Sequence, residues 1–183
     1  LYSSAASDVY KRQGLRGSNL EEMINHSNQV YQEMGLALIQ KIPTPITPIQ
    51  IDQSSRQITL AYFNQKSTVD YIGVVQGVAV CFDAKECHSD TFRLANVHPH
   101  QMVFMKNFEA QQGVAFLIIH YTRKNQLYYL PYRELAYYWK RMEDGGRKSI
   151  SFEEMCKEYP IGQHRDVLVH YLVPLGKDLN ERN

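Results

Sequence analysis

The run VAFLIIHY at residues 114–121 constrains the fold more than any other feature of the sequence. Every residue of this run except His120 is apolar or aromatic. A strand with one face in water alternates apolar and polar residues, whereas an unbroken apolar run is typical of a strand covered on both faces. The chain therefore needs helices on both sides of a sheet, which places it in the α/β class.

Length and composition fit one globular domain. The 183 residues can bury a sizeable core, and 44% hydrophobic with 21% charged residues is ordinary for such a domain. No apolar stretch approaches the roughly 20 residues of a spanning helix, so we expect no membrane segment. No leader pattern is evident, and the few cysteines favour a reducing cytoplasm over a disulfide framework. They are Cys81, Cys87 and Cys156.

The first thirteen residues, LYSSAASDVYKRQ, lack an initiator Met and any hydrophobic periodicity. We interpret residues 1–13 as a non-native or disordered tail and residues 14–183 as a single domain. Without Asp8, Lys11 and Arg12, the 20 basic and 19 acidic residues become 18 and 18, a formal net charge of zero. Attraction to nucleic acid would therefore have to come from local patches.

Two helices carry start and stop signals. Ser18 and Glu21 have capping-box spacing ahead of an apolar period that ends at Gly35. Pro99 suits the first position of a second helix, which Gly113 would end. These signals predict helices over residues 18–34 and 99–112.

Strands are expected between and after these helices. Residues 36–42 predict a short buried strand, and residues 56–63 alternate as a strand. The pattern of residues 68–86 predicts a hairpin that turns at Gln76 and Gly77. Together with the strand at 56–63, this hairpin would make a three-stranded unit. The order is αβββαβ with C-terminal additions, which are a strand at 126–131, helices at 132–143 and 151–159, and a closing strand at 167–173.

A proline-rich segment, PTPITPIQ, places Pro43, Pro45 and Pro48 within six residues. Proline fixes φ and has no backbone donor, so we expect these residues to stay extended and without regular pairing. Residues 43–56 should protrude as a stalk. A plain surface loop is the alternative.

The hairpin carries two acids and a lysine among apolar residues. Thr68 and Asp70 point the same way along a strand, as do Asp83 and Lys85, and a turn at 76–77 brings the four side chains together. Two converging carboxylates would form an oxygen-ligand site for Mg²⁺. The lysine would stabilise charge on phosphorus, so the arrangement predicts metal-assisted phosphodiester hydrolysis.

Other interpretations of these residues exist. Asp70 could be a turn acid, and Asp83 with Lys85 an exposed ion pair that contributes about 0 to 1 kcal/mol. The apolar neighbours of Asp83 favour the metal site, because a charge in a core is costly unless it serves a partner. A zinc site is a further alternative, but no C-x₂-C pair anchors its candidate ligands, which are Cys81, Cys87, His88, His98 and His100.

Asp70 followed by the FDAK motif at 82–85 resembles the PD-(D/E)XK signature of restriction-endonuclease-like nucleases, whose core is αβββαβ. RGSNLEEMIN, KIPTP, STVDYIG, CFDAKE and HPHQ, in this order and spacing, resemble the RecU family of Holliday-junction resolvases over residues 14–135. The resemblance implies a Mg²⁺-dependent endonuclease that resolves four-way DNA junctions in recombination and repair. Two symmetric nicks imply a homodimer, and recombination proteins are further expected partners.

The family's functional positions carry over by motif. The resemblance implies Mg²⁺ (or Mn²⁺) ligands at Thr68, Asp70, Asp83 and Gln101. Lys85 corresponds to the catalytic stabiliser, acting with Asp70 and Asp83. The segment 43–56 corresponds to a stalk that enters the junction centre, with DNA contacts expected from Pro43, Thr44, Pro45 and Pro48.

Some of these positions have a second explanation. Asp83 stands where RecU proteins often have glutamate, which shortens the ligand arm. Gln101 could be a solvated or capping residue of the first helical turn, and Glu21 could be an auxiliary acid or only part of a capping box. His98 and His100 would flank the helix start or contact phosphate.

Two rival functions remain open at this point. One is a related nuclease that cuts ordinary duplex, against which the stalk argues. The other is a DNA-binding protein without catalysis, against which the intact acids and lysine argue. The aromatic segment 128–142 is expected in the core, and DNA backbone contacts could come from Lys140, Arg141, Arg147 and Lys148.

Overall fold

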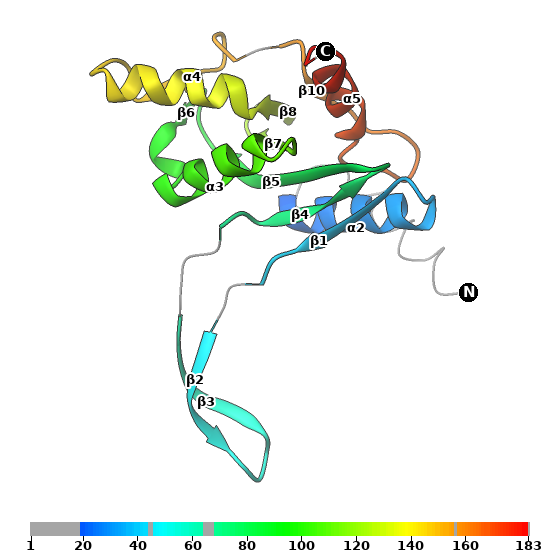
Figure 1. Cartoon of the computed structure of the whole chain (residues 1–183), viewed down its shortest axis with the longest axis vertical. Coiled ribbons are helices and arrows are strands. Elements are labelled where there is room, and N and C mark those ends of the chain that lie inside the picture. The colour runs from blue at the N-terminus through cyan, green and yellow to red at the C-terminus, as the bar shows by residue number, and fades with distance from the viewer. Residues whose placement is uncertain (1–18, 44–45, 64–67, 156, 183) are drawn as a thin grey trace.

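The computed structural model describes residues 19–43, 46–63, 68–155 and 157–182 (Figure 1). The expectations for residues 1–13, Ser18, Thr44, Pro45 and Cys156 fall outside this part of the chain. The helices are α2 (Leu20–Glu33), α3 (Pro99–Ala110), α4 (Tyr132–Glu143), α5 (Leu172–Asn180) and the short 3₁₀ helix η1 (Leu94–Asn96). The strands are β1 (Ala37–Lys41), β2 (Ile46–Asp52), β3 (Gln57–Phe63), β4 (Tyr71–Val75), β5 (Val78–Cys87), β6 (Thr91–Arg93), β7 (Val114–Tyr121), β8 (Gln126–Pro131), β9 (Ser149–Ser151) and β10 (Pro160–Ile161).

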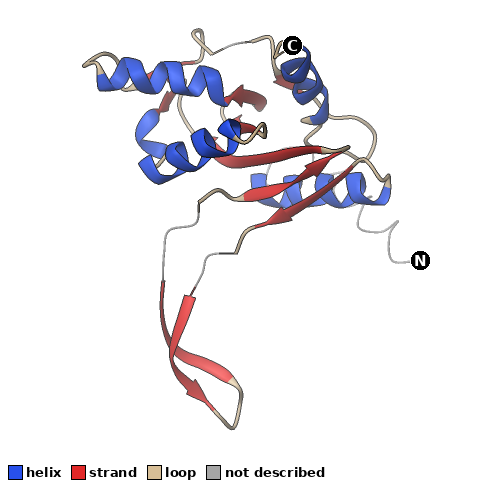
Figure 2. Ribbon diagram, viewed as in Figure 1, coloured by secondary structure: helices blue, strands red, loops and turns tan. Residues whose placement is uncertain are grey.

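A mixed sheet in the order β1-β4-β5-β7-β8-β10 forms the centre of the molecule (Figures 1 and 2). Strands β5 and β7 pair in parallel, and the other neighbours pair antiparallel. Core residues of α2 and α5 pack on one face, and those of α3 and α4 pack on the other. All eight residues of β7 are buried, so the prediction of a strand covered on both faces is confirmed.

A row of stacked aromatic rings stiffens the face under α2. Tyr71, Phe82, Phe116 and Tyr129 come from four adjacent strands, and neighbouring ring centroids are 4.3 to 4.8 Å apart. Each pair adds roughly 0.5–1.5 kcal/mol beyond its buried area. The row fixes the relative positions of β4, which Asp70 directly precedes, and β5, which contains Asp83.

The three-stranded unit is built differently from the expectation. The third strand beside the β4–β5 hairpin is β1, whereas β3 pairs with β2 in a separate ribbon. The αβββαβ order therefore holds with β1 in the place expected for residues 56–63. Strand β1 is also an edge strand whose Leu38 is 63% exposed, so the prediction of a buried strand was wrong.

The stalk protrudes as expected but is a paired ribbon (Figure 1). Strands β2 and β3 pair antiparallel, Pro48 lies opposite Ala61, and the register shifts between Pro48 and Gln50. In a two-stranded ribbon every strand has a free edge, where a residue without an N–H is tolerated. The prediction that proline forbids pairing was therefore wrong, and the protruding segment extends to Phe63.

The expected boundaries of α2 and the hairpin are close to the observed ones. The cap of α2 is Asn19, whose side chain accepts the N–H of Glu21 at 3.0 Å, in place of Ser18. Gly35 follows the helix with φ +66°. Gln76 and Gly77 both have positive φ between paired Val75 and Val78, as a two-residue hairpin turn requires.

Two C-terminal expectations were wrong. Residues 152–155 and 157–159 form turns and bends in place of a helix, because the carboxylate of Glu154 accepts the N–H of Ser151 and its carbonyl accepts the hydroxyl of Tyr138. Residues 167–173 form no strand, and Val169 donates its N–H to Ser27 of α2. Strand β10 closes the sheet instead, and α5 follows.

The aromatic segment lies mainly in the core, as expected, with Tyr137 as the exposed exception at 66%. Within the described ranges, no helix has both the length and the apolar character needed to span a membrane.

Candidate active site

The hairpin register places the two acids side by side. Tyr71 pairs with Phe82, so Asp70 and Asp83 are the next opposing positions. The N–H of Asp70 donates to Oδ1 of Asp83 at 3.0 Å, and Oδ2 of Asp70 accepts the N–H of Ala84 at 3.2 Å. Asp83 is fully buried. The predicted convergence of the two carboxylates is present in the structure.

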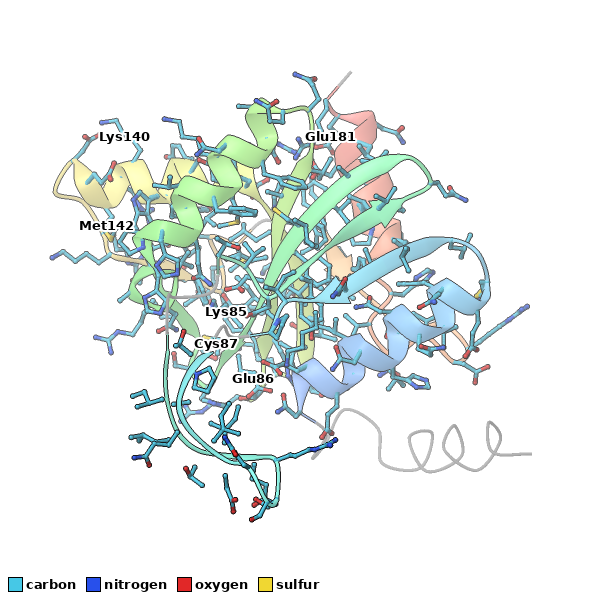
Figure 3. The ribbon with its side chains drawn as sticks, turned by 60° about the horizontal axis from the view of Figure 1, so that its bottom comes forward. Lys85, Glu86, Cys87, Lys140, Met142 and Glu181 are labelled. Carbon is cyan, nitrogen blue, oxygen red and sulfur yellow. The ribbon has the colours of Figure 1, made fainter. Side chains whose placement is uncertain are left out.

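Lys85 joins this pair from the same face of β5. Its Nζ lies 2.5 Å from Oδ2 of Asp83, and its side chain keeps 18% of its surface exposed. Figure 3 labels Lys85 with Glu86 and Cys87 at the end of β5, on the side of the molecule where the stalk joins the body. The lysine therefore contacts a buried acid while part of it still faces solvent.

Gln101 caps the start of α3 and also contacts Asp83. Its Oε1 accepts the N–H of His98, the residue that caps α3, at 3.0 Å. Its Nε2 donates to Oδ2 of Asp83 at 2.7 Å, and the residue is 5% exposed. Because the amide of Gln101 presents its N–H group to Asp83, Gln101 could bind a metal through its oxygen only if the amide turned.

Thr68 and Glu21 are the other two predicted site residues. Thr68 is exposed in the bend ahead of β4, two residues before Asp70. Glu21, in the first turn of α2, forms an ion pair with Lys41. Their roles as ligand and auxiliary acid stay predictions.

The electrostatics of the pair favour a cation. Burial first, and then the hydrogen bond and charge of Asp83, raise the pKa of Asp70 to about 7, against the lowering effects of the Ala84 N–H and Lys85. Two carboxylates in one partly buried site resist joint ionisation unless more positive charge is present. Oxygen donors of this kind fit Mg²⁺ or Mn²⁺, which hold few carboxylates together with water and phosphate oxygens.

The candidate zinc ligands do not converge. Burial raises the pKa of the Cys81 thiol to about 12, and the thiol of Cys87 donates to the carbonyl of Ser89. His98 and His100 stack on each other at 5.3 Å between ring centroids. Over the described residues, no group of three or more His, Cys, Asp or Glu side chains is arranged to hold a metal.

The stalk leaves the body beside the carboxylates. Lys41, the last residue of β1, pairs with Tyr71, and the next residue, Ile42, donates its N–H to the carbonyl of Asp70 at 2.8 Å. Along the chain, β2 begins four residues after Ile42, and β3 ends at Phe63, seven residues before Asp70. The protruding ribbon and the candidate site therefore share one end of the sheet (Figure 1).

Sequence reasoning missed contacts that tie this end of the sheet to α2. Oε1 of Glu86 accepts the N–H of Leu20 at 3.3 Å, and Lys41 pairs with Glu21. No local pattern marks these residues, because their partners lie 66 and 20 positions away.

Three of the four basic residues expected to contact DNA backbone have acidic partners within the chain. Lys140 pairs with Asp144, whereas Arg141 and Arg147 both pair with Glu154. Their DNA contact stays a prediction.

Comparison with known proteins identifies relatives over most of the chain. Residues 15–177 match the family model described as "RecU: Recombination protein U". The "Holliday junction resolvase RecU" of Limosilactobacillus reuteri is 41% identical over 88% of this chain and 82% of its own length. That of Staphylococcus aureus is 39% identical over 90% of this chain and 81% of its own length.

A solved structure of Hjc from Archaeoglobus fulgidus, described as a Holliday junction resolvase, matches with a TM-score of 0.35 and 9% identity, over 61% of this chain and 74% of that one. The family model's match, residues 15–177, includes the α2 helix, the stalk and the acids with their lysine. The chain therefore belongs to the RecU family.

Proposed function

We propose that this protein is a Mg²⁺-dependent, structure-selective endonuclease that resolves four-way DNA junctions by paired symmetric nicks. The observation that carries the proposal is the site itself. The carboxylate of Asp83 accepts the N–H of Asp70, and the carboxylate of Asp70 accepts the N–H of Ala84. Lys85 contacts Asp83, and the carbonyl of Asp70 accepts the N–H of Ile42, which precedes the protruding ribbon. Membership in a family whose named relatives are junction resolvases supports the choice of substrate.

The residues present fit a divalent cation. Asp70 and Asp83 would hold it, with Gln101 after a turn of its amide and Thr68 as further oxygen donors. When bound, the cation supplies positive charge beside the scissile phosphate and a more acidic water. Mn²⁺ could replace Mg²⁺, because both accept carboxylate and amide oxygens.

Lys85 stabilises the reaction without acting as a ligand. Hydrolysis of a phosphodiester adds negative charge to the phosphate oxygens as water attacks phosphorus and the P–O bond to the leaving oxygen breaks. The ammonium group of Lys85 is held by Asp83 and partly exposed, so it can donate to a phosphate oxygen or orient the attacking water. Gln101, bonded to Asp83 and to the start of α3, keeps that carboxylate in one orientation.

The stalk selects the substrate by shape. The ribbon from Ile46 to Phe63 projects from the body beside the acids, and it can enter DNA that has an opening. A four-way junction has such an opening at its centre and a linear duplex has none. The near-neutral chain supplies little sequence-independent attraction to phosphate, so shape carries more of the discrimination.

The expected oligomeric state follows from the two symmetric nicks that resolution of a junction requires. Two equal nicks in a two-fold substrate require two equal sites, which a two-fold homodimer presents. Recombination proteins are expected partners. Because the proposed substrate is chromosomal DNA, we expect the protein to act in the cytoplasm.

A nicking assay tests the proposal. Purified protein is mixed with a labelled four-way junction or a matched linear duplex, each in Mg²⁺ and in chelator. We expect cleavage of the junction in Mg²⁺ alone. Equal cleavage of both substrates would favour a duplex nuclease, and tight junction binding without cleavage in either Mg²⁺ or Mn²⁺ would favour a non-catalytic DNA-binding protein.

A further inference from the structure

Asp70 is held in place by its backbone, although it lies just outside the sheet. Strand β4 begins at Tyr71. The N–H of Asp70 donates to Asp83, and its carbonyl accepts the N–H of Ile42 at 2.8 Å. Ile42 is the residue at which β1 passes into the stalk. One hydrogen bond therefore connects the foot of the stalk to a candidate metal ligand.

The residues on both sides of this bond are anchored to α2. Lys41 precedes Ile42 and forms an ion pair with Glu21. Tyr71 follows Asp70, is fully buried, and donates its hydroxyl to Asn25 at 3.0 Å. Lys41 and Tyr71 are also cross-strand partners, so the N-terminal half of α2 holds both of them.

The same helix end is tied to the other strand of the site. The N–H of Leu20, the first residue of α2, donates to Glu86, which follows Lys85 on β5. Contacts thus pass from Asp70 through Ile42, Lys41 and the first turn of α2 to Glu86, Lys85 and Asp83. These contacts connect, through α2, the two strands that carry the carboxylate pair.

We propose that Lys41 is a positioning residue that couples the stalk to the active site through its ion pair with Glu21. The pair fixes the foot of the stalk, so that Ile42 holds Asp70 where metal binding requires it. Lys41 itself belongs to the α2 face of the sheet with Tyr71, and Asp83 points to the opposite face. This inference rests on the function proposed above.

Magnitudes separate this role from a structural one. Both side chains of the Lys41–Glu21 pair are 43% exposed, and such pairs change the folding equilibrium by no more than about fivefold. A displacement of a reacting group by about 1 Å, in contrast, can cost on the order of 100-fold in rate. Loss of Lys41 should therefore lower turnover by up to about fivefold, whereas a purely structural loss of the same size would leave the turnover of the folded protein unchanged.

The test compares Lys41→Met with Lys177→Met. Lys177 is a matched control, because it is 42% exposed, pairs with Glu158, and its replacement removes the same charge. For each variant we would measure kcat and KM on a four-way junction, Mg²⁺ affinity by calorimetry without DNA, junction affinity in chelator, and Tm. For Lys41→Met we expect kcat to fall about two- to fivefold with weaker Mg²⁺ binding, and junction affinity to change less than about twofold.

A charge swap identifies the ion pair as the cause. The double variant Glu21→Lys with Lys41→Glu should recover most of the lost kcat and Mg²⁺ affinity, and neither single change should do so. Unchanged Mg²⁺ affinity in Lys41→Met would overturn the proposal, as would a loss confined to junction affinity, which would make Lys41 a phosphate contact. If the parent cut no junction, the proposed function would fail, and the Mg²⁺ titrations would still test the positioning role.

Discussion

Asp70→Asn should inactivate the protein and at the same time stabilise its metal-free fold. The pKa of Asp70 rises from 3.8 to about 7, first because of burial and then because of Asp83. The folded state therefore holds this proton more tightly than the unfolded chain, so the parent's free energy of unfolding falls as the pH rises from about 4 to 7. At about 1.4 kcal/mol per pKa unit, the loss reaches an upper limit of roughly 4 kcal/mol at pH 8.

Asparagine resembles the protonated acid and can still accept the N–H of Ala84. Urea unfolding in chelator should show Asp70→Asn more stable than the parent at pH 8, by on the order of 2–4 kcal/mol, and the two proteins equal near pH 4. Asp52→Asn is the control, since the side chain and N–H of Ser54 lower the pKa of Asp52 to about 2. That variant should gain no stability at pH 8.

Mg²⁺ should reverse the order, because the cation stabilises only the form that binds it. Added Mg²⁺ should raise the Tm of the parent and leave Asp70→Asn nearly unchanged, and junction cleavage by Asp70→Asn should fall by orders of magnitude. An Asp70→Asn variant that is less stable than the parent at pH 8 in chelator would refute the reasoning, because Asp70 would then serve the fold and not a cation.

Three other changes test separate parts of the account. Lys85→Ala should lower kcat on junctions at least tenfold with little change in junction or Mg²⁺ affinity, and a loss confined to junction affinity would make Lys85 a simple phosphate contact. Replacing residues 46–63 with a short Gly-Ser linker should preserve Tm and Mg²⁺ binding but remove the preference for junctions over duplex; retained selectivity would assign shape recognition to the body. Asp178→Asn should destabilise the fold by about 1–3 kcal/mol, because Arg133 and Arg182 lose their buried acid and keep only Glu181 and Glu109. Burial raises the pKa of Asp178, but hydrogen bonds from Arg182 and others lower it on balance. The parent should therefore lose the stability that this acid contributes as the pH falls below about 4. Urea unfolding at pH 3 and pH 7 would test this, and the parent and Asp178→Asn should differ less at pH 3.

Local patterns in the sequence identified the elements that carry the chemistry. The unbroken apolar run of β7 required cover on both faces, and alternation around Gln76 and Gly77 fixed which side chains of the hairpin face each other. The opposition of Asp70 and Asp83 follows from that register alone. These features depend on residues close together in the sequence, and both are present in the structure.

Features that depend on distant partners were beyond such reasoning. Residues 57–63 alternate in the same way whether they join the central sheet or the ribbon with β2, so their partner could not be known. Residues 167–173 look like a strand, but Val169 bonds to Ser27 and Tyr171 to Asn28 on α2, more than 140 positions away. The anchoring roles of Lys41 and Glu86 were missed for the same reason.

Mapping the nicks strand by strand tests the central claim most directly. A static four-way junction would carry a label on one of its four strands at a time, and cleavage in Mg²⁺ would be followed under single-turnover conditions with the parent and with Asp83→Asn. The account predicts nicks at symmetric positions in one pair of opposite strands near the junction centre, and none with Asp83→Asn. Nicks scattered along the arms, or a matched linear duplex cut as fast as the junction, would contradict it.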